Sequence, residues 1–572
     1  MYVLIYAYIH PIFNSSNVIF PYAINNFNIV ERYPELWVKL ISYFHISNLL
    51  VFLILNILYI SHLKKEEVLK NNSCVKQKNV KKLDKKTIIK KQKDVLESLN
   101  NEKLNILLGF DENGIPIYLK EEGLFQNVLI TGSIGTGKTS STMYPMTRQI
   151  LEYKSFNKKE KIGGLILDVK GNYYKEVEKI LENSGRKSDL IVIDLSGNTR
   201  YNPLDKIDLN PEVIANRLKN ILLLFSPETT ESFWLDKTET LISECIKFIR
   251  IYNDSYVDFK ELNKIINSKE YYDEKINIVR ELVYKGVLGE KEIYDLSTFI
   301  DFYNKEFLEL DSRTSSIIKS ELSRITSIFI SNYHINKSFC PKKDEINFHG
   351  FDQVIEEGKV VVLNMNISEH RNLSKIIASY LKFDFQTAVL KRLSNNLDIR
   401  KTFFICDEYQ EYVTESDVSF YSTSREAKCI NIIATQSYSS IKNALASQNS
   451  SDVIIQNLIN KIWFRNDDNY TIESAIRQIG KEEIERTGRT MSENAKNSFY
   501  NHITKSFTSI DSGLSESYNT TKHLEDRFNP KFFSQELSVF EALVFISDGK
   551  EIKRPTKVKL LPEYLRGIVL KG

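Results

Sequence analysis

From about residue 104 onwards, the chain alternates between short apolar runs and longer segments with a helical repeat of hydrophobic positions. Several of the short runs are continuously apolar, which is typical of parallel strands buried on both faces of a sheet. This alternation predicts an α/β fold in which helices pack on a largely parallel sheet. The expected strands are Asn127–Thr131, Gly164–Asp168, Leu190–Asp194, Val360–Met365, Thr402–Cys406, Asn431–Ala434 and Ile462–Arg465.

Between about residues 207 and 345, the helical repeat continues without any clear strand. Insertions of that length are uncommon unless they have structure of their own. We therefore expect an all-α domain at 207–345, set into an α/β domain made of 104–206 and 346–572. Its helical segments are expected at Val213–Phe225, Phe233–Ile251, Ile276–Val287, Ile293–Leu308 and Ile317–Phe329.

The most apolar stretch lies near the start of the sequence. Leu40–Ile60 has 21 residues without a formal charge, and at about 1.5 Å per residue it matches a hydrocarbon core of about 30 Å. The lysines that begin at Lys64 predict that the chain beyond the span stays in the cytoplasm. A buried core helix is the alternative for this stretch. Tyr2–Ile24 is either a first span, a truncated first span or an interfacial segment. We expect a transmembrane anchor over residues 1–62.

Charge is distributed unevenly along the chain. Residues 64–93 hold twelve lysines and three acids, whereas the whole chain has a net charge of only +3. The basic linker at 63–103 therefore indicates either attraction to anionic lipid or a solvated tether. The overall charge gives no argument for nucleic-acid binding. The five cysteines are scattered without a C-x-x-C pair, which argues against a zinc site or a disulfide framework.

A glycine-rich loop follows the first expected strand. Gly132, Gly137, Lys138 and Thr139 match the phosphate-binding pattern G-x-x-x-x-G-K-[ST]. In such a loop, backbone N–H groups close around a polyphosphate, the lysine reaches the outer phosphates and the hydroxyl ligates Mg²⁺. A plain glycine turn with a solvated lysine is the alternative, and the apolar strand in front of the loop disfavours it. We expect ATP and Mg²⁺ to be bound by Gly132, Ser133, Ile134, Gly135, Thr136, Gly137, Lys138, Thr139 and Ser140.

A second strand ends in two carboxylates. The run Phe403-Phe-Ile-Cys-Asp-Glu408 places Asp407 where it can hold Mg²⁺, together with Thr139. The adjacent Glu408 can polarise the attacking water, which indicates a hydrolase rather than a nucleotide-binding switch. Taken alone, an apolar run before Asp-Glu is equally consistent with a strand end that faces solvent. Together with the phosphate-binding loop, it predicts an ATPase site.

Two more residues are candidates for catalytic roles. Gln436, at the end of the following strand, is suited to sense the γ-phosphate or to orient water, and a plain polar strand end is the less favoured alternative. Arg425 lies on the segment between these two strands. In a ring it could face a neighbour's γ-phosphate as an arginine finger. As a lone arginine, Arg425 is more often part of a surface ion pair.

Four further segments, together with the loop and the carboxylates, resemble those of one protein family. They are Leu167-Asp-Val-Lys-Gly171, Arg200-Tyr-Asn-Pro-Leu-Asp205, Arg425 followed by Ala434-Thr-Gln-Ser437, and Asn460-Lys-Ile-Trp-Phe-Arg-Asn-Asp467 with Gly480. The set resembles the TraG/TraD-type DNA-transfer ATPases, which are the coupling proteins of type IV secretion and conjugation. The resemblance runs from about residue 120 to 550, behind an anchor such as this family would have.

The resemblance implies a RecA-like motor that assembles as a membrane-anchored homo-hexamer around a channel, with ATP between subunits. It places the protein in the inner (cytoplasmic) membrane, with the bulk of the chain in the cytoplasm. The implied partners are relaxase-bound single-stranded DNA, effector proteins and components of a type IV secretion channel. The implied role of the all-α domain is to handle this cargo.

Two other functions are compatible with the same motifs. An FtsK-like septal or chromosomal DNA translocase would share the motor, but such proteins usually have more spans and a C-terminal winged helix. Arg486–Gly572 is rich in serine and asparagine around Ser492–Thr521 and then strand-like, and it shows no helix-turn-helix pattern. A membrane scaffold that binds nucleotide without hydrolysis is the third possibility, and Lys138 and Glu408 argue against it.

Overall fold

The computed structural model describes residues 103–225, 232–366, 369–395, 399–445, 447–495, 498–501, 506–509 and 512–564. All of these belong to one compact unit of the chain, residues 84–572. The expected spans at 2–24 and 40–60, and nearly all of the basic linker, lie outside the described residues. Among the helices that the structure does describe, none combines the length and hydropathy that a membrane crossing needs.

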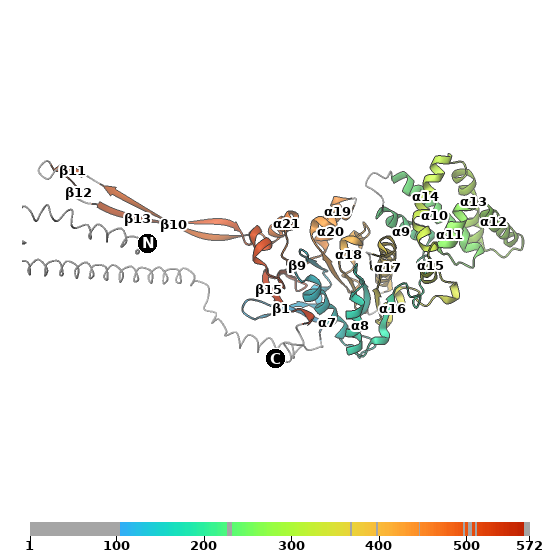
Figure 1. The fold of residues 1–572 in the computed structure, drawn as a ribbon, viewed down its shortest axis with the longest axis horizontal. Helices are drawn as coiled ribbons and strands as arrows, with labels where there is room; N and C mark the ends of the chain where they lie inside the picture. The colour runs from blue at the N-terminus through green and yellow to red at the C-terminus, as the bar shows by residue number, and fades with distance from the viewer. Residues whose placement is uncertain are drawn as a thin grey trace, which may run out of the picture. The chain divides into compact units, whose positions relative to one another are not determined.

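A mixed sheet of eleven strands forms the centre of the described part of the chain (Figure 1). Seven neighbouring strands run parallel. In spatial order they are β9 (Asn460–Phe464), β3 (Val128–Thr131), β8 (Cys429–Thr435), β7 (Thr402–Cys406), β4 (Gly163–Leu167), β6 (Val360–Leu363) and β5 (Leu190–Ile193). These are the seven strands that the apolar runs predicted, with small shifts at the ends. The expectation of an α/β fold with a largely parallel sheet is confirmed.

Four antiparallel strands extend the sheet beyond β9, and the sequence pattern did not predict their positions. They are β14 (Glu541–Phe545), β15 (Thr556–Leu560), β1 (Asn105–Phe110) and β2 (Pro116–Lys120). β2 and β15 are only partly buried, because an antiparallel edge can leave one face to solvent. Such strands lack the continuous apolar run by which the parallel strands were found.

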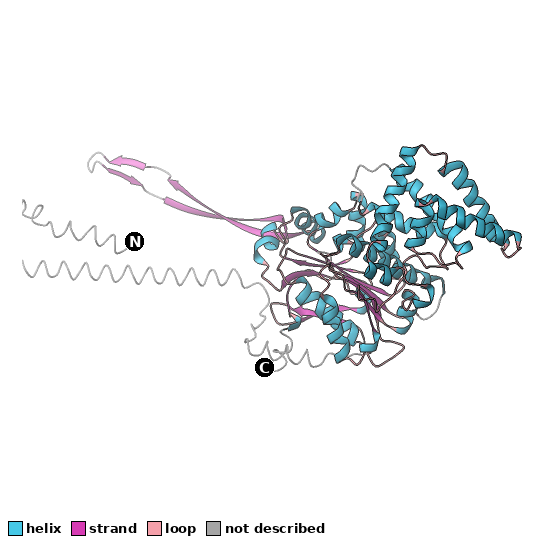
Figure 2. Ribbon diagram, turned by 45° about the vertical axis from the view of Figure 1, so that its right-hand side comes forward, coloured by secondary structure: helices cyan, strands magenta, loops and turns pink. Residues whose placement is uncertain are grey.

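Helices cover both faces of the sheet, so that the strands lie between two helical layers (Figure 2). Alternate residues of β3 point to opposite faces, with Leu129 in one core and Val128 in the other. α7 (Tyr144–Glu152) and α8 (Tyr173–Asn183) cover the face of Val128. The face of Leu129 is covered by α16 (Phe351–Glu357), α17 (Arg371–Lys391) and α18 (Asp417–Thr423). The short helix α6 (Glu121–Leu124) precedes β3, α19 (Tyr438–Ala444) and α20 (Gln448–Asn457) connect β8 to β9, and α21 (Asn469–Ile479) follows β9.

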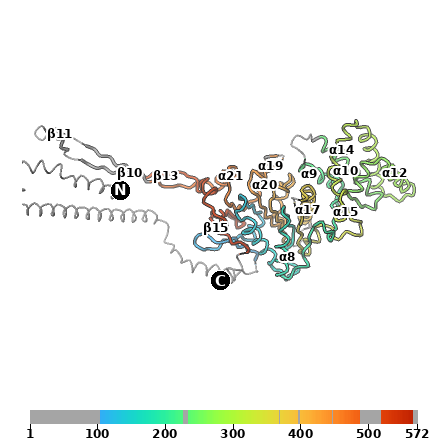
Figure 3. Tube along the Cα trace, in the orientation of Figure 1, coloured from blue at the N-terminus to red at the C-terminus, as the bar shows by residue number. Residues whose placement is uncertain are grey.

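Between β5 and α16, the described helices gather into one body, coloured green to yellow in Figure 3. They are α9 (Pro211–Leu223), α10 (Ser232–Tyr252), α11 (Phe259–Asn267), α12 (Lys269–Tyr284), α13 (Glu290–Phe302), α14 (Ser312–Ile330) and α15 (Tyr333–Phe339). Stacked aromatic rings form the centre of this body, with centroids 4.4 Å apart for Phe248 and Phe299 and 4.0 Å apart for Phe259 and Phe329. The sequence pattern predicted neither α11 nor α15, which are short.

Asp384 on α17 joins the helical body to the layers of the sheet. Its buried carboxylate accepts a hydrogen bond from Arg217 Nη1 of α9 at 2.6 Å and lies 2.7 Å from Lys206 Nζ. The Tyr201 hydroxyl donates to the same carboxylate. Burial alone would raise the pKa of Asp384, but Lys206 and Arg217 hold it below its ordinary value. The Asn202-Pro-Leu204 segment, which lies between Tyr201 and Lys206, is thereby fixed against α17.

A two-stranded ribbon is inserted between α21 and β14. β10 (Lys481–Ala495) pairs in register with β13 (Ser512–Asp526), and β11 (Ser498–Asn501) pairs with β12 (Ser506–Ser509) further along the same hairpin. The ribbon contains most of the serine- and asparagine-rich region.

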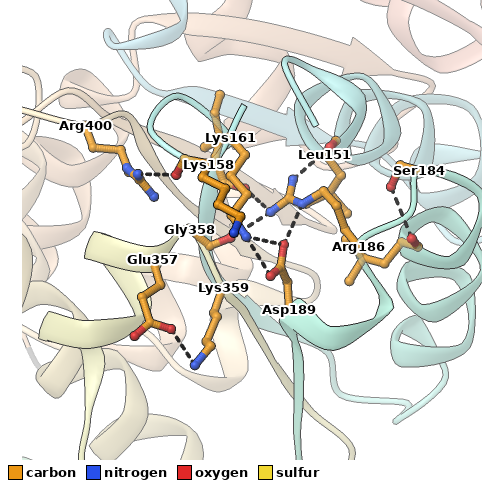
Figure 4. Close-up of polar contacts among 12 residues, drawn as sticks. Leu151, Lys158, Lys161, Ser184, Arg186, Asp189, Glu357, Gly358, Lys359 and Arg400 are labelled. Atoms are coloured by element: carbon orange, nitrogen blue, oxygen red, sulfur yellow. Dashed lines mark hydrogen bonds and ion pairs between the residues drawn. The ribbon is translucent and has the colours of Figure 1, made fainter. Parts of the chain in front are cut away.

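At the amino-terminal ends of the parallel strands, the buried Arg186 holds several loops together (Figure 4). Its Nε donates to Asp189 Oδ2 at 2.8 Å, and Lys161 Nζ donates to Asp189 Oδ1 at 2.7 Å. Its Nη atoms donate to the carbonyl oxygens of Leu151, Ile162 and Gly358 at 2.7–2.9 Å. One guanidinium therefore satisfies polar groups from the end of α7, the start of β4 and the loop before β6.

Candidate active site

The carboxyl ends of β3, β8, β7 and β4 lie next to one another, so the residues that follow these strands converge at one edge of the sheet. The phosphate-binding loop follows β3, Gln436 follows β8, and Asp407 and Glu408 follow β7. Backbone bonds fix these loops to each other: Gly132 N donates to Gln436 O at 3.2 Å, and Asp407 N donates to Leu167 O at 3.0 Å. The position resembles the crevice at which open α/β sheets bind ligands.

The loop from Gly132 to Ser140 has the backbone geometry of a phosphate cradle. Gly135 and Gly137 have φ values of +78° and +98°, which L side chains rarely adopt. A Cβ added to Gly137 would lie 2.4 Å from Phe540 Cδ1, so only glycine fits there. Lys138 Nζ donates to Gly132 O at 2.6 Å, and the chain turns into a helix at Thr139. The loop can therefore present its N–H groups and the start of that helix to an anion.

Thr139 and Asp407 come together as the sequence predicted for a magnesium site. Thr139 Oγ1 donates to Asp407 Oδ2 at 2.8 Å. Asp407 is 2% exposed. A hydroxyl and a carboxylate oxygen are hard donors of the kind that Mg²⁺ prefers beside substrate phosphates. This pair therefore fits the cation that normally accompanies ATP in such a site.

Like charges are crowded at this edge. Burial, reinforced by the neighbouring carboxylates of Glu408 and Asp168, raises the pKa of Asp407 to about 6, although the Thr139 hydroxyl and Lys170 oppose the shift. Burial also lowers the pKa of Lys138, against the pull of Glu408 and Asp407. Shifts of this kind, produced by desolvation together with specific charged neighbours, are typical of functional sites.

Glu408 is held in an unusual conformation and by two amides. Its φ of +49° is in the left-handed region, which is uncommon for a residue with a side chain. Gln410 Nε2 and Gln436 Nε2 both donate to Glu408 Oε2, at 2.7 Å and 3.3 Å. The structure thus brings Glu408 and Gln436 into one constellation with Asp407 and the phosphate-binding loop.

Arg425 is not part of that constellation within one chain. It lies between α18 and β8, four residues before β8 begins, and so at the opposite edge of the sheet from Gln436. β8 has seven residues, which corresponds to about 23 Å of strand between the two edges. The Arg425 side chain is exposed, with no hydrogen bond or ion pair to any residue within the described ranges. Arg425 can complete a nucleotide site only in a second copy of the chain.

Three neighbours of the site were not predicted to act there. Lys170 lies close enough to Lys138 and Asp407 for its charge to lower the pKa of both. Phe540 packs on Gly137, and its N–H donates to Thr136 O at 3.1 Å. Gln410 links Glu408 to Thr435, whose hydroxyl donates to Gln410 Oε1 at 2.8 Å. The Asp168-Val-Lys-Gly171 segment was a signal for Lys170, whereas nothing in the sequence indicated Phe540.

Comparison with known proteins connects this geometry to one family. Residues 322–511 match the family described as the type IV secretion-system coupling protein DNA-binding domain. No curated protein sequence matches the chain. Two solved structures that are similar are the unbound bacterial conjugative coupling protein TrwBdeltaN70 and the plasmid coupling protein TrwB in complex with ADP and Mg²⁺.

Both structures share the fold of this chain at low sequence identity. The unbound form has a TM-score of 0.54 and 13% identity, over 83% of this chain and 91% of that one. The ADP complex has a TM-score of 0.53 and 13% identity, over 79% of this chain and 88% of that one. The family match, the shared fold and the motifs at the sheet edge agree with one another. Residues 322–511 therefore match a domain of type IV secretion-system coupling proteins, and the fold of the chain is shared with TrwB.

Proposed function

We propose that the protein is a membrane-anchored ATPase that couples ATP hydrolysis to the transfer of a DNA–protein substrate into a type IV secretion channel. The observation that carries the proposal is the convergence of Lys138, Thr139, Asp407, Glu408 and Gln436 at one edge of the sheet. A binding scaffold would need the phosphate-binding loop alone. The two additional groups, Glu408 and Gln436, are those that hydrolysis requires.

Each residue has a defined task in this proposal. The phosphate-binding loop and Lys138 hold the β- and γ-phosphates, and the Thr139–Asp407 pair holds Mg²⁺, which neutralises charge on the phosphate oxygens when it is bound. Glu408 takes the proton from the attacking water. Gln410 and Gln436 donate to Glu408 Oε2, so they orient its carboxylate. The Gln436 carbonyl accepts the Gly132 N–H of the loop, and we propose that the Gln436 side chain contacts the γ-phosphate.

The assignment to DNA transfer rests on the family and on the fold. The matched family is described as a DNA-binding domain of coupling proteins, and nucleotide complexes of TrwB share the fold. We propose that the cargo is relaxase-bound single-stranded DNA, with effector proteins as the other candidate class. The assembly would be a homo-hexamer with ATP between subunits.

The first test is ATP turnover by the full chain in detergent, with and without single-stranded DNA. Lys138→Ala should lose nucleotide binding and turnover, whereas Lys175→Ala, an exposed lysine on α8, should retain both. A wild-type protein that binds MgATP without hydrolysing it would replace the ATPase with the scaffold function.

Arg425 provides the test of assembly. In a ring it would stabilise charge on the neighbour's γ-phosphoryl oxygens, an effect of about 10³-fold or more on the rate. Arg425→Ala should keep nucleotide affinity while hydrolysis collapses. Mixing it with Lys138→Ala subunits should restore activity, because some interfaces then pair an intact loop with an intact arginine. Co-assembled mixed rings without activity would rule out a trans role for Arg425.

The anchor and the cargo domain are proposed from the sequence. Leu40–Ile60 should keep the protein in the inner membrane during carbonate extraction, and release by carbonate would contradict a transmembrane anchor. The helical body, α9–α15, would select cargo. Exchanging it with that of a related system should change the transferred substrate, and an unchanged substrate in a correctly assembled chimera would assign selection elsewhere.

A further inference from the structure

Asn127, the residue just before β3, lies in a buried polar cluster at the edge of the sheet opposite the active site. It is 2% exposed and has a φ of +61°, a conformation that asparagine tolerates better than most residues. Its Nδ2 donates to Tyr421 O at 3.2 Å and to Asn457 O at 3.0 Å. Its backbone carbonyl accepts the Asn460 N–H at 3.1 Å. One residue therefore holds α18, α20 and β9 against the strand that leads into the phosphate-binding loop.

The side-chain oxygen of Asn127 completes a closed triangle with two other buried residues. Asn431 Nδ2, on β8, donates to Asn127 Oδ1 at 2.6 Å and to Ser424 Oγ at 2.9 Å. Ser424 Oγ in turn donates to Asn127 Oδ1 at 3.3 Å. Ser424 and Asn431 are both 0% exposed. Buried polar side chains that satisfy one another in this way specify a single arrangement of the backbone segments that carry them.

The segment that this triangle fixes is the turn that carries Arg425. Ser424 directly precedes Arg425, and Ser424 O accepts the Cys429 N–H at 3.1 Å. Arg425 O accepts the Lys428 N–H at 3.0 Å. The Arg425 side chain itself makes no hydrogen bond or ion pair with the described residues. The direction in which Arg425 leaves the surface is therefore set by the backbone of this turn and not by contacts of its own side chain.

We propose that Asn127, Ser424 and Asn431 are positioning residues that aim Arg425 at the nucleotide of the neighbouring subunit. The inference rests on the proposed function, in which ATP lies between subunits and Arg425 acts in trans. The inference goes beyond that function in one respect. Within one subunit, it connects Arg425, which acts on the neighbouring subunit, to β3, which leads into the phosphate-binding loop of the same subunit. β3 has four residues, so about 13 Å of rigid strand separates the two ends of this connection.

The test uses mixed rings of full-length subunits. In each ring, the subunit that provides Arg425 (the donor) differs from the subunit that binds the nucleotide (the acceptor). Lys138→Ala subunits donate Arg425 and bind no nucleotide, and Arg425→Ala subunits bind nucleotide and donate no arginine. Ser424→Ala is placed either in the donor or in the acceptor. Loss of one positioning hydrogen bond should lower hydrolysis about fivefold in the donor, and less than twofold in the acceptor.

Ser422→Ala, on the exposed side of α18, serves as the control and should have no effect in either subunit. Asn431→Ala is the second variant, and it should give a larger loss with the same asymmetry. Equal losses in donor and acceptor, or no loss in the donor, would overturn the inference, because a role in packing alone affects both subunits alike. An inactive mixture without Ser424→Ala would remove the trans role of Arg425 and this inference with it. A wild type without ATP hydrolysis would instead overturn the proposed function.

Discussion

The two edges of the parallel sheet are built on opposite electrostatic principles. At the amino-terminal edge, Arg186, Lys161 and Asp189 satisfy one another and three backbone carbonyls (Figure 4). At the carboxyl-terminal edge, the buried Asp407 lies beside the half-buried Glu408, and burial raises the pKa of Asp407 to about 6. The first edge is complete within the chain, whereas at the second edge the Thr139 hydroxyl and Lys170 do not offset the burial of Asp407, whose pKa stays raised.

The difference separates residues that hold the fold from residues that hold a ligand. A buried ion pair whose hydrogen bonds are all made contributes to a defined structure, and breaking it is costly. A buried carboxylate with a raised pKa destabilises its own fold and is compensated when a cation binds. In the proposed function, the cation that compensates Asp407 is Mg²⁺ bound together with nucleotide, whereas the contacts at the amino-terminal edge are already made within the chain.

The largest effect is expected from Glu408→Gln at the ligand-binding edge. The substitution keeps shape and hydrogen bonding but removes the proton acceptor, so hydrolysis should fall about 10³-fold. Affinity for MgATP should stay within about threefold, since Lys138 and the loop are intact. Turnover and the Kd for a fluorescent ATP analogue would be measured together, with Glu415→Gln, further along the same connection, as the control. Undiminished turnover would exclude Glu408 as the water-activating base.

A large loss of stability without loss of ligand affinity is expected from Arg186→Met at the opposite edge. The change leaves three buried carbonyls without a donor and should lower the free energy of unfolding by about 3 to 4 kcal/mol. Because the active site is at the other end of the strands, the Kd for MgATP should be unchanged in protein that remains folded. Denaturation midpoints in detergent would measure the loss of stability, and titration with nucleotide would measure the Kd for MgATP.

Lys187→Met is the matched control for Arg186→Met. Lys187 is exposed and pairs with Glu182 and Glu178 on the surface, so its loss should change stability by no more than about 0.5 kcal/mol. A weaker affinity for MgATP in Arg186→Met, with little change in stability, would contradict the conclusion that the amino-terminal edge stabilises the fold and the carboxyl-terminal edge binds the ligand.

The sequence predicted the parallel strands of the sheet because a strand that is buried on both faces is a continuous apolar run in the sequence. Each of the seven parallel strands is a short apolar run, such as Thr402–Cys406, which the structure reproduces without a shift. The antiparallel strand β15 has no such trace, since its lysines alternate with Val558 and Leu560. The contacts of the Asp384 carboxylate could not be predicted either, because its partners come from positions about 170 residues away in the chain.

The candidate site was predicted to the extent that its residues follow strands. Asp407, Glu408 and Gln436 were found as polar residues after apolar runs, and the geometry of parallel strands brings such residues together. Arg425 precedes β8, so the geometry of parallel strands assigns it to the amino-terminal edge of the sheet. The arginine-then-glutamine motif alone does not show that the two residues lie at opposite edges. Phe540 comes from a later antiparallel connection, and only the folded chain shows that it covers Gly137.

The smallest expected effect is a gain in stability from Asp407→Asn. The folded protein holds the Asp407 proton up to a pH of about 6, whereas the unfolded chain releases it near its ordinary pKa. Between about pH 4 and 6 the folded state therefore binds more protons, and the contribution of this group to stability falls as the pH rises through that window. Above pH 6 the buried charge is fully present, so in EDTA Asp407→Asn should be more stable than the wild type by about 1 to 3 kcal/mol. Below pH 4 the stabilities of Asp407→Asn and the wild type should converge.

Addition of MgATP should make the wild type the more stable protein, because the ligand stabilises the wild type by mass action and the variant has lost a ligand for the cation. Asp548→Asn is the control with opposite sign: backbone N–H groups lower the pKa of Asp548, so its substitution should not raise stability at any pH. If Asp407→Asn is less stable than the wild type at pH 8 in EDTA, the carboxylate is already compensated within the chain, and the two edges do not differ in the way described above.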